Sequence, residues 1–321
     1  MTIEDSVNSS VAKIIILTGP TAVGKSSIAL DFAENTNKTH SSKIEIVNAD
    51  SVCFYREFNI GSAKPSDEEL QRVPHHLINI ADPHENYHAG QFIKDGETVL
   101  KEIHARGNRA LIVGGSGFYL KTLRFGLWEA PPTSPEFRET LKDKTNAELY
   151  EDLVKIDPAQ AAKISVQDRY RIIRALEIVA VSGKIPSQLE SEMPSHPNPA
   201  YVMWVLDRDK DELAVRMRSR IEKMIADGLI DEVIKLRDRY PLSKTLHAVG
   251  YQQVLDFLNG EKPEGRQIKV GITGLIDEIE LAHRQLAKQQ RTWFKNLKPN
   301  ETFVLDQDQS LLKEKLMNFY Q

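Results

Sequence analysis

One short motif constrains the fold of this chain more than any other feature. Residues 19–26, with the sequence Gly-Pro-Thr-Ala-Val-Gly-Lys-Ser, fit the pattern G-x-x-x-x-G-K-[ST] of a phosphate-binding loop. The motif follows a β-branched apolar run at 11–18, which predicts a buried strand, and precedes helically spaced apolar residues at 26–34. The sequence therefore predicts a strand, a loop and a helix that together bind an anion.

The residues of this motif suit a diphosphate or triphosphate ligand. Glycines allow several backbone N–H groups to point at one anion, and the following helix presents its positive N-terminal end. Lys25 adds a positive charge, and the Ser26 hydroxyl is placed to reach a metal ion such as Mg²⁺. The predicted ligand-binding residues are Gly19, Pro20, Thr21, Ala22, Val23, Gly24, Lys25 and Ser26.

Strand and helix patterns alternate through the first part of the chain, which predicts an α/β fold with a parallel sheet. After the proline-rich residues 130–135 the pattern is helical only, up to about Gly183, and a strand-like run at 201–206 then returns to the sheet. We predict a P-loop α/β core, residues 11–125 and 200–321, interrupted by a small all-helical insertion domain, residues 126–199. Further strands are predicted at 44–47, 110–113 and 303–305. Further helices are predicted at 91–105, at 168–182, from about residue 210 onward, and at 273–297. Residues 187–199 are predicted to form an exposed loop.

The charge balance argues against a generic nucleic-acid coat, which is usually strongly basic. Among 321 residues, Lys plus Arg is 42 and Asp plus Glu is 46, so the formal net charge is −4. Basic residues nevertheless concentrate at 169–174 and 284–298. A local groove that binds RNA phosphates is therefore compatible with the composition.

Several features predict a cytoplasmic protein without a membrane segment. The first ten residues contain two acids and no basic residue, unlike a secretory signal. The longest apolar runs are too short to span a bilayer. Cys53 is the only cysteine, so an intramolecular disulfide cannot form, and a reducing compartment fits.

An acidic residue, Asp50, follows the strand predicted at 44–47. Ligands of a parallel sheet bind beyond the carboxyl ends of its strands, where the phosphate loop and Asp50 should both lie. Position alone leaves two interpretations open, a substrate-facing carboxylate and a helix N-cap. The strand at 110–113 runs into Gly114 and Gly115 instead of the aspartate that holds Mg²⁺ in a typical P-loop NTPase. This pattern favours transfer chemistry over a motor or a switch.

Dispersed motifs resemble those of the tRNA dimethylallyltransferases, also called tRNA isopentenyltransferases. They follow the family's order from about residue 14 to residue 295: Asn-Ala-Asp-Ser at 48–51, Gly-Ser-Ala-Lys-Pro at 61–65, Pro-His-His-Leu at 74–77, Val-Gly-Gly-Ser-Gly-Phe-Tyr at 113–119, Arg-Ala-Leu-Glu at 174–177, Val-Gly-Tyr at 249–251 and Gln-Leu-Ala-Lys-Gln-Gln-Arg-Thr-Trp-Phe at 285–294. A single cysteine cannot build the C-terminal zinc finger of eukaryotic members, so the chain is similar to the bacterial type.

The resemblance implies the transfer of a dimethylallyl group from dimethylallyl diphosphate to N6 of adenosine 37 in tRNA, beside the anticodon, with release of diphosphate. The phosphate loop would hold the diphosphate, with Mg²⁺ as cofactor near Ser26. The implied catalytic residues are Asp50 as general base, Lys25, and Arg220 in contact with the diphosphate. Arg216 shares a helix face with Arg220, and whether it belongs to the site or to the solvated surface stays open.

The resemblance also implies where tRNA binds. On the helix predicted at 168–182, Arg171 and Arg174 share one face, although a merely solvated basic face fits the residues equally well. The residues implied to contact tRNA are Asp50, Ser51, Val52, Cys53, Ser116, Arg138, Tyr170, Arg171, Ile172, Ile173, Arg174, His247, Ala248, Val249, Gly250, Tyr251 and Gln252. Because the family often has arginine at the position of His247, that contact is expected to be weaker or pH-dependent.

Two other features of the sequence are expected to be structural. Trp293 lies on the apolar stripe of the helix predicted at 273–297, so we expect it in the core. The pair His75-His76 could suggest a metal, but no further ligands lie at metal-binding spacing, so a hydrogen-bonding role is expected.

Two alternative functions stay open. An isopentenyltransferase that acts on free adenine nucleotides has a similar loop, and a P-loop nucleotide kinase would use the loop for ATP. The helical insertion and the basic C-terminal half favour tRNA, because a free nucleotide needs no such surface. We therefore expect tRNA and dimethylallyl diphosphate as partners of a monomer.

Overall fold

The structure, a computed structural model, describes residues 13–128, 130–261 and 267–321. The prediction about the first ten residues, and the start of the strand predicted at 11–18, lie outside the described residues. The chain divides into two compact units: a core unit, which runs up to Arg124 and resumes for Pro197–Gln321, and a helical unit, Phe125–His196. None of the described helices is long and apolar enough to cross a membrane.

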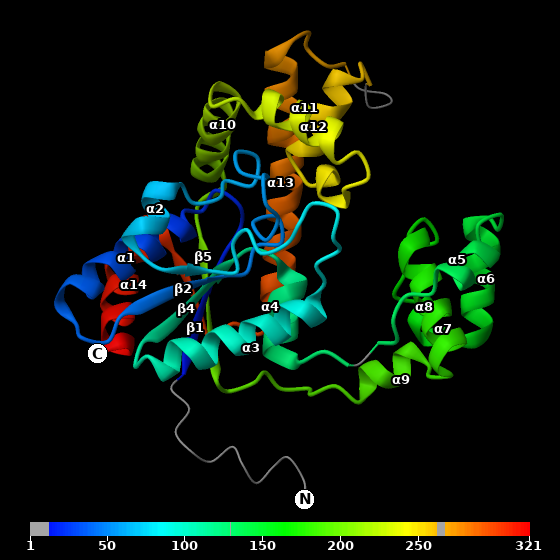
Figure 1. The fold of residues 1–321 in the computed structure, drawn as a ribbon, viewed down its shortest axis with the longest axis horizontal. Helices are drawn as coiled ribbons and strands as arrows, with labels where there is room; N and C mark the ends of the chain where they lie inside the picture. The colour runs from blue at the N-terminus through cyan, green and yellow to red at the C-terminus, as the bar shows by residue number, and fades with distance from the viewer. Residues whose placement is uncertain (1–12, 129, 262–266) are drawn as a thin grey trace, which may run out of the picture. The chain divides into compact units, whose positions relative to one another are not determined.

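The core unit contains one parallel sheet of six strands, which confirms the predicted α/β class (Figure 1). Its order is β3-β2-β4-β1-β5-β6, and every neighbouring pair is parallel. The strands are β1 (Ile14–Thr18), β2 (Ile44–Asn48), β3 (His75–His76), β4 (Arg109–Gly114), β5 (Tyr201–Asp207) and β6 (Glu301–Val304). Because β1 lies between β4 and β5, the loop that follows β1 leaves the middle of the sheet.

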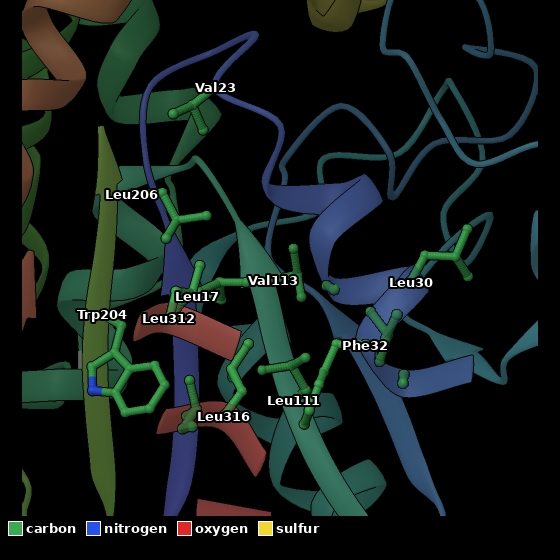
Figure 2. Close-up of a cluster of buried hydrophobic side chains, with 14 of the residues drawn as sticks. Leu17, Val23, Leu30, Phe32, Leu111, Val113, Trp204, Leu206, Leu312 and Leu316 are labelled. Carbon is green, nitrogen blue, oxygen red and sulfur yellow. The ribbon is translucent and has the colours of Figure 1, made fainter. Parts of the chain in front are cut away.

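Helices cover both sides of this sheet, which explains why its central strands are almost continuously apolar. On one side, α1 (Lys25–Thr39) and α14 (Leu305–Tyr320) bury a cluster against β1, β4 and β5 (Figure 2). Leu17, Leu111, Trp204 and Leu316 belong to it and are at most 4% exposed. α3 (Ala89–Ala105) packs against β2 and β4.

The core unit contains further helices, most of which follow a strand in the chain. They are α2 (Asp67–Arg72), α4 (Gly117–Phe125), α10 (Lys210–Ala226), α11 (Leu229–Arg239), α12 (Tyr251–Leu258) and α13 (Ile272–Asn296), with a 3₁₀ helix η2 (Lys244–His247). α10 packs against α13, and Arg218 joins them through Asp277 and Glu280. This pair forms one wall of the site described below.

The helical unit has a small core of its own. It consists of α5 (Pro135–Thr140), α6 (Asn146–Ile156), α7 (Pro158–Ala161), α8 (Arg169–Ser182) and α9 (Pro186–Ser191). Leu149, Leu153 and Ile172 are fully buried. The helix predicted at 168–182 is confirmed: Asp168 caps its first turn at the Arg171 N–H, and Gly183 ends it with a φ of +69°.

The structure also contains elements that the periodicity did not predict. α14 follows β6 immediately, and β3 has only two residues, too few for an alternating pattern. Residues 186–191, assigned mostly to an exposed loop, form the short helix α9 that starts at a proline.

Candidate active site

A large cleft opens in the core unit at the carboxyl ends of β1, β2 and β4. Its volume is about 1570 Å³, and the loops after these three strands line it together with α10 and α13. This is the edge at which ligands bind in open parallel sheets. Lys25, Asp50 and Arg220, which sequence analysis assigned to catalysis, all line this one cleft.

The phosphate loop has a backbone conformation that favours glycine at two positions, Gly19 and Gly24. A Cβ on Gly19 would come within 2.3 Å of the Leu206 carbonyl oxygen, and Gly24 caps α1 with a φ of +104°. Ala22 also has a left-handed φ, +64°, which costs a non-glycine residue on the order of 1 kcal/mol. The loop thus delivers Lys25 to the first turn of α1, with the N-terminal end of the helix directed at the cleft.

Lys25 and Arg220 are two half-buried cations on which the same carboxylate, Asp50, acts. Burial lowers the pKa of Lys25, Asp50 opposes that effect, and Arg220 adds to it. Burial likewise lowers the pKa of Arg220, with Asp50 opposing. Among the described residues, no group accepts a hydrogen bond from the buried Arg220 Nε. A buried N–H without a partner costs stability, so the site suits an anionic ligand that supplies an acceptor.

Asp50 lies in a turn after β2, not at a helix N-cap. Its N–H donates to Asn48 Oδ1 at 3.0 Å, and its Oδ1 accepts from the Val52 N–H at 3.2 Å. The next residue is fixed as well, because the Ser51 N–H donates to Ser116 Oγ at 2.8 Å. The carboxylate is therefore held at the cleft by its own turn and by the loop after β4.

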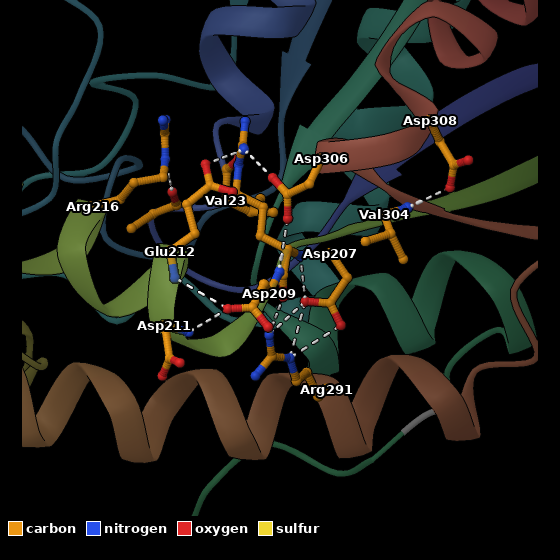
Figure 3. A network of polar contacts seen from close by, with 12 residues as sticks. Val23, Asp207, Asp209, Asp211, Glu212, Arg216, Arg291, Val304, Asp306 and Asp308 are labelled. Atoms are coloured by element: carbon orange, nitrogen blue, oxygen red, sulfur yellow. Dashed lines mark hydrogen bonds and ion pairs between the residues drawn. The ribbon is translucent and has the colours of Figure 1, made fainter.

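The strands beside β1 do not provide the Mg²⁺-binding aspartate of a typical P-loop NTPase. Within the described sheet, β4 ends at Gly114, where a Cβ would lie 2.2 Å from the Ala49 backbone. β5 ends at Asp207, whose carboxylate pairs with Arg291 (Figure 3), at 2.7 Å between Nη2 and Oδ1. The described residues contain no group of three or more His, Cys, Asp or Glu side chains able to hold a metal ion.

The open question about Arg216 has a structural answer. Its Nε donates to the Ala22 carbonyl of the phosphate loop at 3.1 Å (Arg216 is labelled in Figure 3). Arg216 also lines the cleft. Arg208, which sequence analysis did not single out, donates from Nε to the next carbonyl, that of Val23, at 2.9 Å. Both guanidinium groups therefore hold the loop.

The loop at 59–65 forms another wall of the cleft and is tied down by α11 and α12. The Glu232 carboxylate accepts from the N–H groups of residues 59–61, and the Tyr251 hydroxyl donates to Glu232 at 2.7 Å. Lys64 donates to the Tyr55 carbonyl and to two asparagine side chains, and burial lowers its pKa to about 8. These contacts explain the Gly-Ser-Ala-Lys-Pro motif as a structural feature of the cleft.

The positions implied to contact tRNA fall into different environments. In the core unit, Ser51, Val52, Cys53, Ser116, Ala248 and Val249 line the cleft. Burial raises the pKa of the Cys53 thiol to about 12, so it stays protonated. Gly250 caps α12, Tyr251 is fully buried, and His247 and Gln252 contact each other. The Tyr251 side chain thus has an internal role, which the resemblance did not reveal.

In the helical unit the implied positions divide in the same way. Tyr170 and Arg171 are well exposed, at 60% for the tyrosine, whereas Ile172 is in the core and Ile173 packs against it. Arg138 and Arg174 both pair with the buried Glu177.

One expectation about an aromatic side chain is wrong, and one about a histidine pair agrees with the structure. Trp293 is 37% exposed and lines the cleft, because the face of α13 that carries it turns from the core toward the loop at Gly117. His76 hydrogen-bonds to Glu45 at 2.6 Å and His75 to the Val73 carbonyl at 2.8 Å. Sequence reasoning also missed His283, a buried cleft residue whose pKa burial lowers to about 4.

The parallel sheet, the glycine loop after its central strand and the adjoining cleft define an α/β protein with its candidate site at the carboxyl ends of the strands. A family model described as IPP transferase matches residues 53–297. The chain is 38% identical to tRNA dimethylallyltransferase 1 of Citrifermentans bemidjiense, over 92% of each chain, and 39% identical to a tRNA dimethylallyltransferase of Microcystis aeruginosa, over 89% of this chain and 86% of the other. We conclude that the chain belongs to the IPP transferase family, the family of the tRNA dimethylallyltransferases.

Solved structures agree with this assignment. The full-length tRNA isopentenylpyrophosphate transferase of Bacillus halodurans is 32% identical, with a TM-score of 0.65 over 96% of this chain and 95% of that one. A eukaryotic dimethylallyltransferase, solved in crystallographic snapshots acting on tRNA, has a TM-score of 0.78 at 24% identity, over 95% of this chain and 77% of that one. At that level of identity, the similarity to the eukaryotic enzyme is evidence for a shared fold alone.

Proposed function

We propose that this chain transfers the dimethylallyl group of dimethylallyl diphosphate to N6 of adenosine 37 in tRNA and releases diphosphate. One observation carries the proposal: the phosphate loop, two half-buried cations and one carboxylate line a single cleft. The cations suit a leaving diphosphate, and the carboxylate suits a proton acceptor. Membership in the IPP transferase family supports the same reaction.

The leaving group is stabilised by donors that are in place before the reaction begins. The C1–O bond of dimethylallyl diphosphate breaks as the N6 lone pair bonds to C1, and the bond's electron pair leaves with diphosphate. Three groups can stabilise the negative charge on the departing diphosphate: Lys25, the N-terminal end of α1 and the unpartnered Arg220 Nε. Fixed donors of this kind contribute roughly 10²–10³-fold each to such reactions.

Ser26 fits a Mg²⁺ ion that takes most of its ligands from diphosphate and water. Its hydroxyl lies exposed in the cleft, one residue after Lys25, and a hard oxygen ligand is what Mg²⁺ prefers. When bound, the ion would neutralise part of the diphosphate charge.

Asp50 accepts the proton that N6 loses as the new bond forms. One of its oxygens is held by the Val52 N–H, which fixes the direction of the carboxylate. A positioned base contributes roughly 10²–10⁴-fold. The cleft exceeds the range of about 300–1,000 Å³ typical of a small-ligand site, which suits a flipped base beside a prenyl diphosphate.

Exposed side chains of the helical unit supply a surface for the RNA. Tyr170 and Arg171 are both exposed in the first turn of α8, one suited to stacking and the other to a phosphate. We propose that the protein does this as a monomer in the cytoplasm, where tRNA is modified.

The test is incubation of the protein with total tRNA and dimethylallyl diphosphate, followed by mass spectrometry of the nucleosides. We expect dimethylallyl-adenosine and an equal amount of diphosphate. Replacing Asp50→Ala should reduce the rate at least 100-fold and leave tRNA affinity within about twofold, whereas Asp31→Ala, an exposed acid on α1, should change neither. Transfer to free AMP but not to tRNA, or phosphoryl transfer from ATP, would contradict the proposal.

A further inference from the structure

The motif at 285–294 on α13 contains a glutamine with no part in the chemistry described above. Gln290 is buried, at 8% exposure, at the back of the cleft. A buried amide needs hydrogen-bond partners, so the groups that satisfy Gln290 indicate what it does.

Gln290 bonds with both ends of its side-chain amide to the two loops that flank the reaction. Its Oε1 accepts from the Thr21 N–H of the phosphate loop at 2.8 Å. Its Nε2 donates to the Gly115 carbonyl of the loop after β4 at 3.0 Å. A Cβ on Gly115 would lie 2.7 Å from this Nε2, so a side chain at position 115 would displace the Gln290 amide.

The second loop continues the connection to the carboxylate. Ser116 Oγ, next in the chain after Gly115, accepts from the Ser51 N–H beside Asp50. Side-chain and backbone bonds therefore run without a break from the diphosphate loop, through Gln290, to the turn that carries the base.

The phosphate loop has other attachments, so it does not depend on Gln290 for its fold. Arg216, on α10, donates to the Ala22 carbonyl. Arg208, two residues before α10 begins, donates to the Val23 carbonyl. Arg291, the neighbour of Gln290, donates to the Arg208 carbonyl and so steadies that attachment (Figure 3 shows Arg291 and Arg216). Loss of the Gln290 bonds should shift the loop rather than unfold it.

We propose that Gln290 is a positioning residue that sets the distance between the leaving diphosphate and Asp50. The inference rests on the proposed function and deepens it. Both hydrogen-bonding ends of the Gln290 amide are engaged by the Thr21 and Gly115 backbones, so we expect it to act through these two loops. Misplacement by about 1 Å can cost on the order of 100-fold in rate, so the expected effect is large.

The test compares Gln290→Met, which has the same length but no amide, with Gln285→Met, an exposed glutamine on the same helix. Rates are measured with each substrate varied, and affinity for inorganic diphosphate with Mg²⁺ is measured by calorimetry. For Gln290→Met we expect kcat to fall at least tenfold and diphosphate affinity at least threefold, with KM for tRNA within twofold. Gln285→Met should match the wild type in all three quantities.

A second variant, Gln290→Asn, keeps a polar side chain in the site but is too short to reach both loops. It should show the same loss of kcat with a melting temperature close to that of the wild type. Unchanged kcat and diphosphate affinity in either folded variant would overturn the proposal. So would a failure of both variants to fold, because Gln290 would then be a general core residue. If the wild type itself transfers nothing to tRNA, the proposed function fails, while diphosphate affinity still tests Gln290.

Discussion

A buried carboxylate in the helical unit allows a quantitative prediction. The Glu177 side chain is fully buried and accepts from Arg138 at 2.8 and 2.9 Å, from Arg174 at 2.5 Å and from the Ser134 N–H at 2.8 Å. Desolvation would raise its pKa, but the hydrogen bonds from the two arginines outweigh it and lower the pKa from 4.5 to about 2. That difference corresponds to about 3 kcal/mol of stability at neutral pH.

Replacing Glu177→Gln removes the charge and keeps the shape. Two arginines then lack their counter-charge, and breaking a buried pair in this way costs about 3–5 kcal/mol. Because both arginines are partly exposed, at 30% and 21%, water can meet some of their charge, and the lower end of that range applies. We therefore expect the helical unit to lose about 3 kcal/mol.

The pH dependence follows from the direction of the pKa shift. A carboxyl whose pKa is lowered by folding stabilises the protein above its unfolded pKa of 4.5, and the contribution disappears as pH falls toward about 2. The difference between wild type and variant should thus be about 3 kcal/mol at pH 7 and about 2 kcal/mol at pH 3.5.

Amide hydrogen exchange of α8, followed by mass spectrometry, measures this difference locally in the full chain. At each pH the two proteins are compared with each other, so the intrinsic exchange rate cancels, and about 3 kcal/mol appears as roughly 100-fold faster exchange. Glu139→Gln, in an exposed pair with Lys142, is the control and should change stability by less than about 1 kcal/mol. Equal exchange in wild type and Glu177→Gln, or a difference independent of pH, would refute the reasoning.

Three further predictions concern the tRNA surface and the cleft. Arg171→Ala should weaken tRNA binding and reduce the slope of log affinity against log salt by about one, because this exposed arginine can meet a phosphate; titrations at several salt concentrations measure it. Tyr251→Phe removes the hydroxyl that bridges Glu232 and the Ser62 N–H, so we expect a loss of about 1–2 kcal/mol in chemical unfolding and faster proteolysis near residue 62. Gly114→Ala would force a Cβ to within 2.2 Å of the Ala49 backbone, and we expect circular dichroism and activity to report a protein that no longer folds correctly.

The parts of the fold that could be predicted are those encoded by neighbours in the chain. Residues 11–34 contain, in this order, a β-branched run, a glycine loop and apolar residues at helical spacing. That order within 24 residues predicts a strand, a loop and a helix of a parallel α/β sheet. β3 and α14 were not predicted, because one is two residues long and the other lies beyond the last recognised strand. Their place depends on the packing of residues that are distant in sequence.

The same distinction applies to the site. Lys25 and Asp50 could be placed because each follows a strand and strand ends meet at one edge of a sheet. Helical spacing could not show that Trp293 faces the cleft, because an apolar stripe and a cleft-lining stripe look alike in sequence. The role of Gln290 depends on partners 269 and 175 residues away, and its polar character and its place in the motif at 285–294 do not reveal them.

Charge counting along the chain overstates the surface available to RNA. Of the arginines in the basic run at 169–174, Arg169 donates to backbone carbonyls at 141, 142 and 144, and Arg174 pairs with the buried Glu177. Arg171 pairs with Asp168 on the surface and, at 64% exposure of its side chain, is the most available of the three to a phosphate. In the run at 284–298, Arg291 pairs with Asp207 and is mostly covered, whereas Arg284 pairs with Glu280 but keeps an exposed side chain. Since each phosphate contact adds about one to the salt slope, the slope for tRNA binding should reflect these few exposed cations and not the number of basic residues in the two runs.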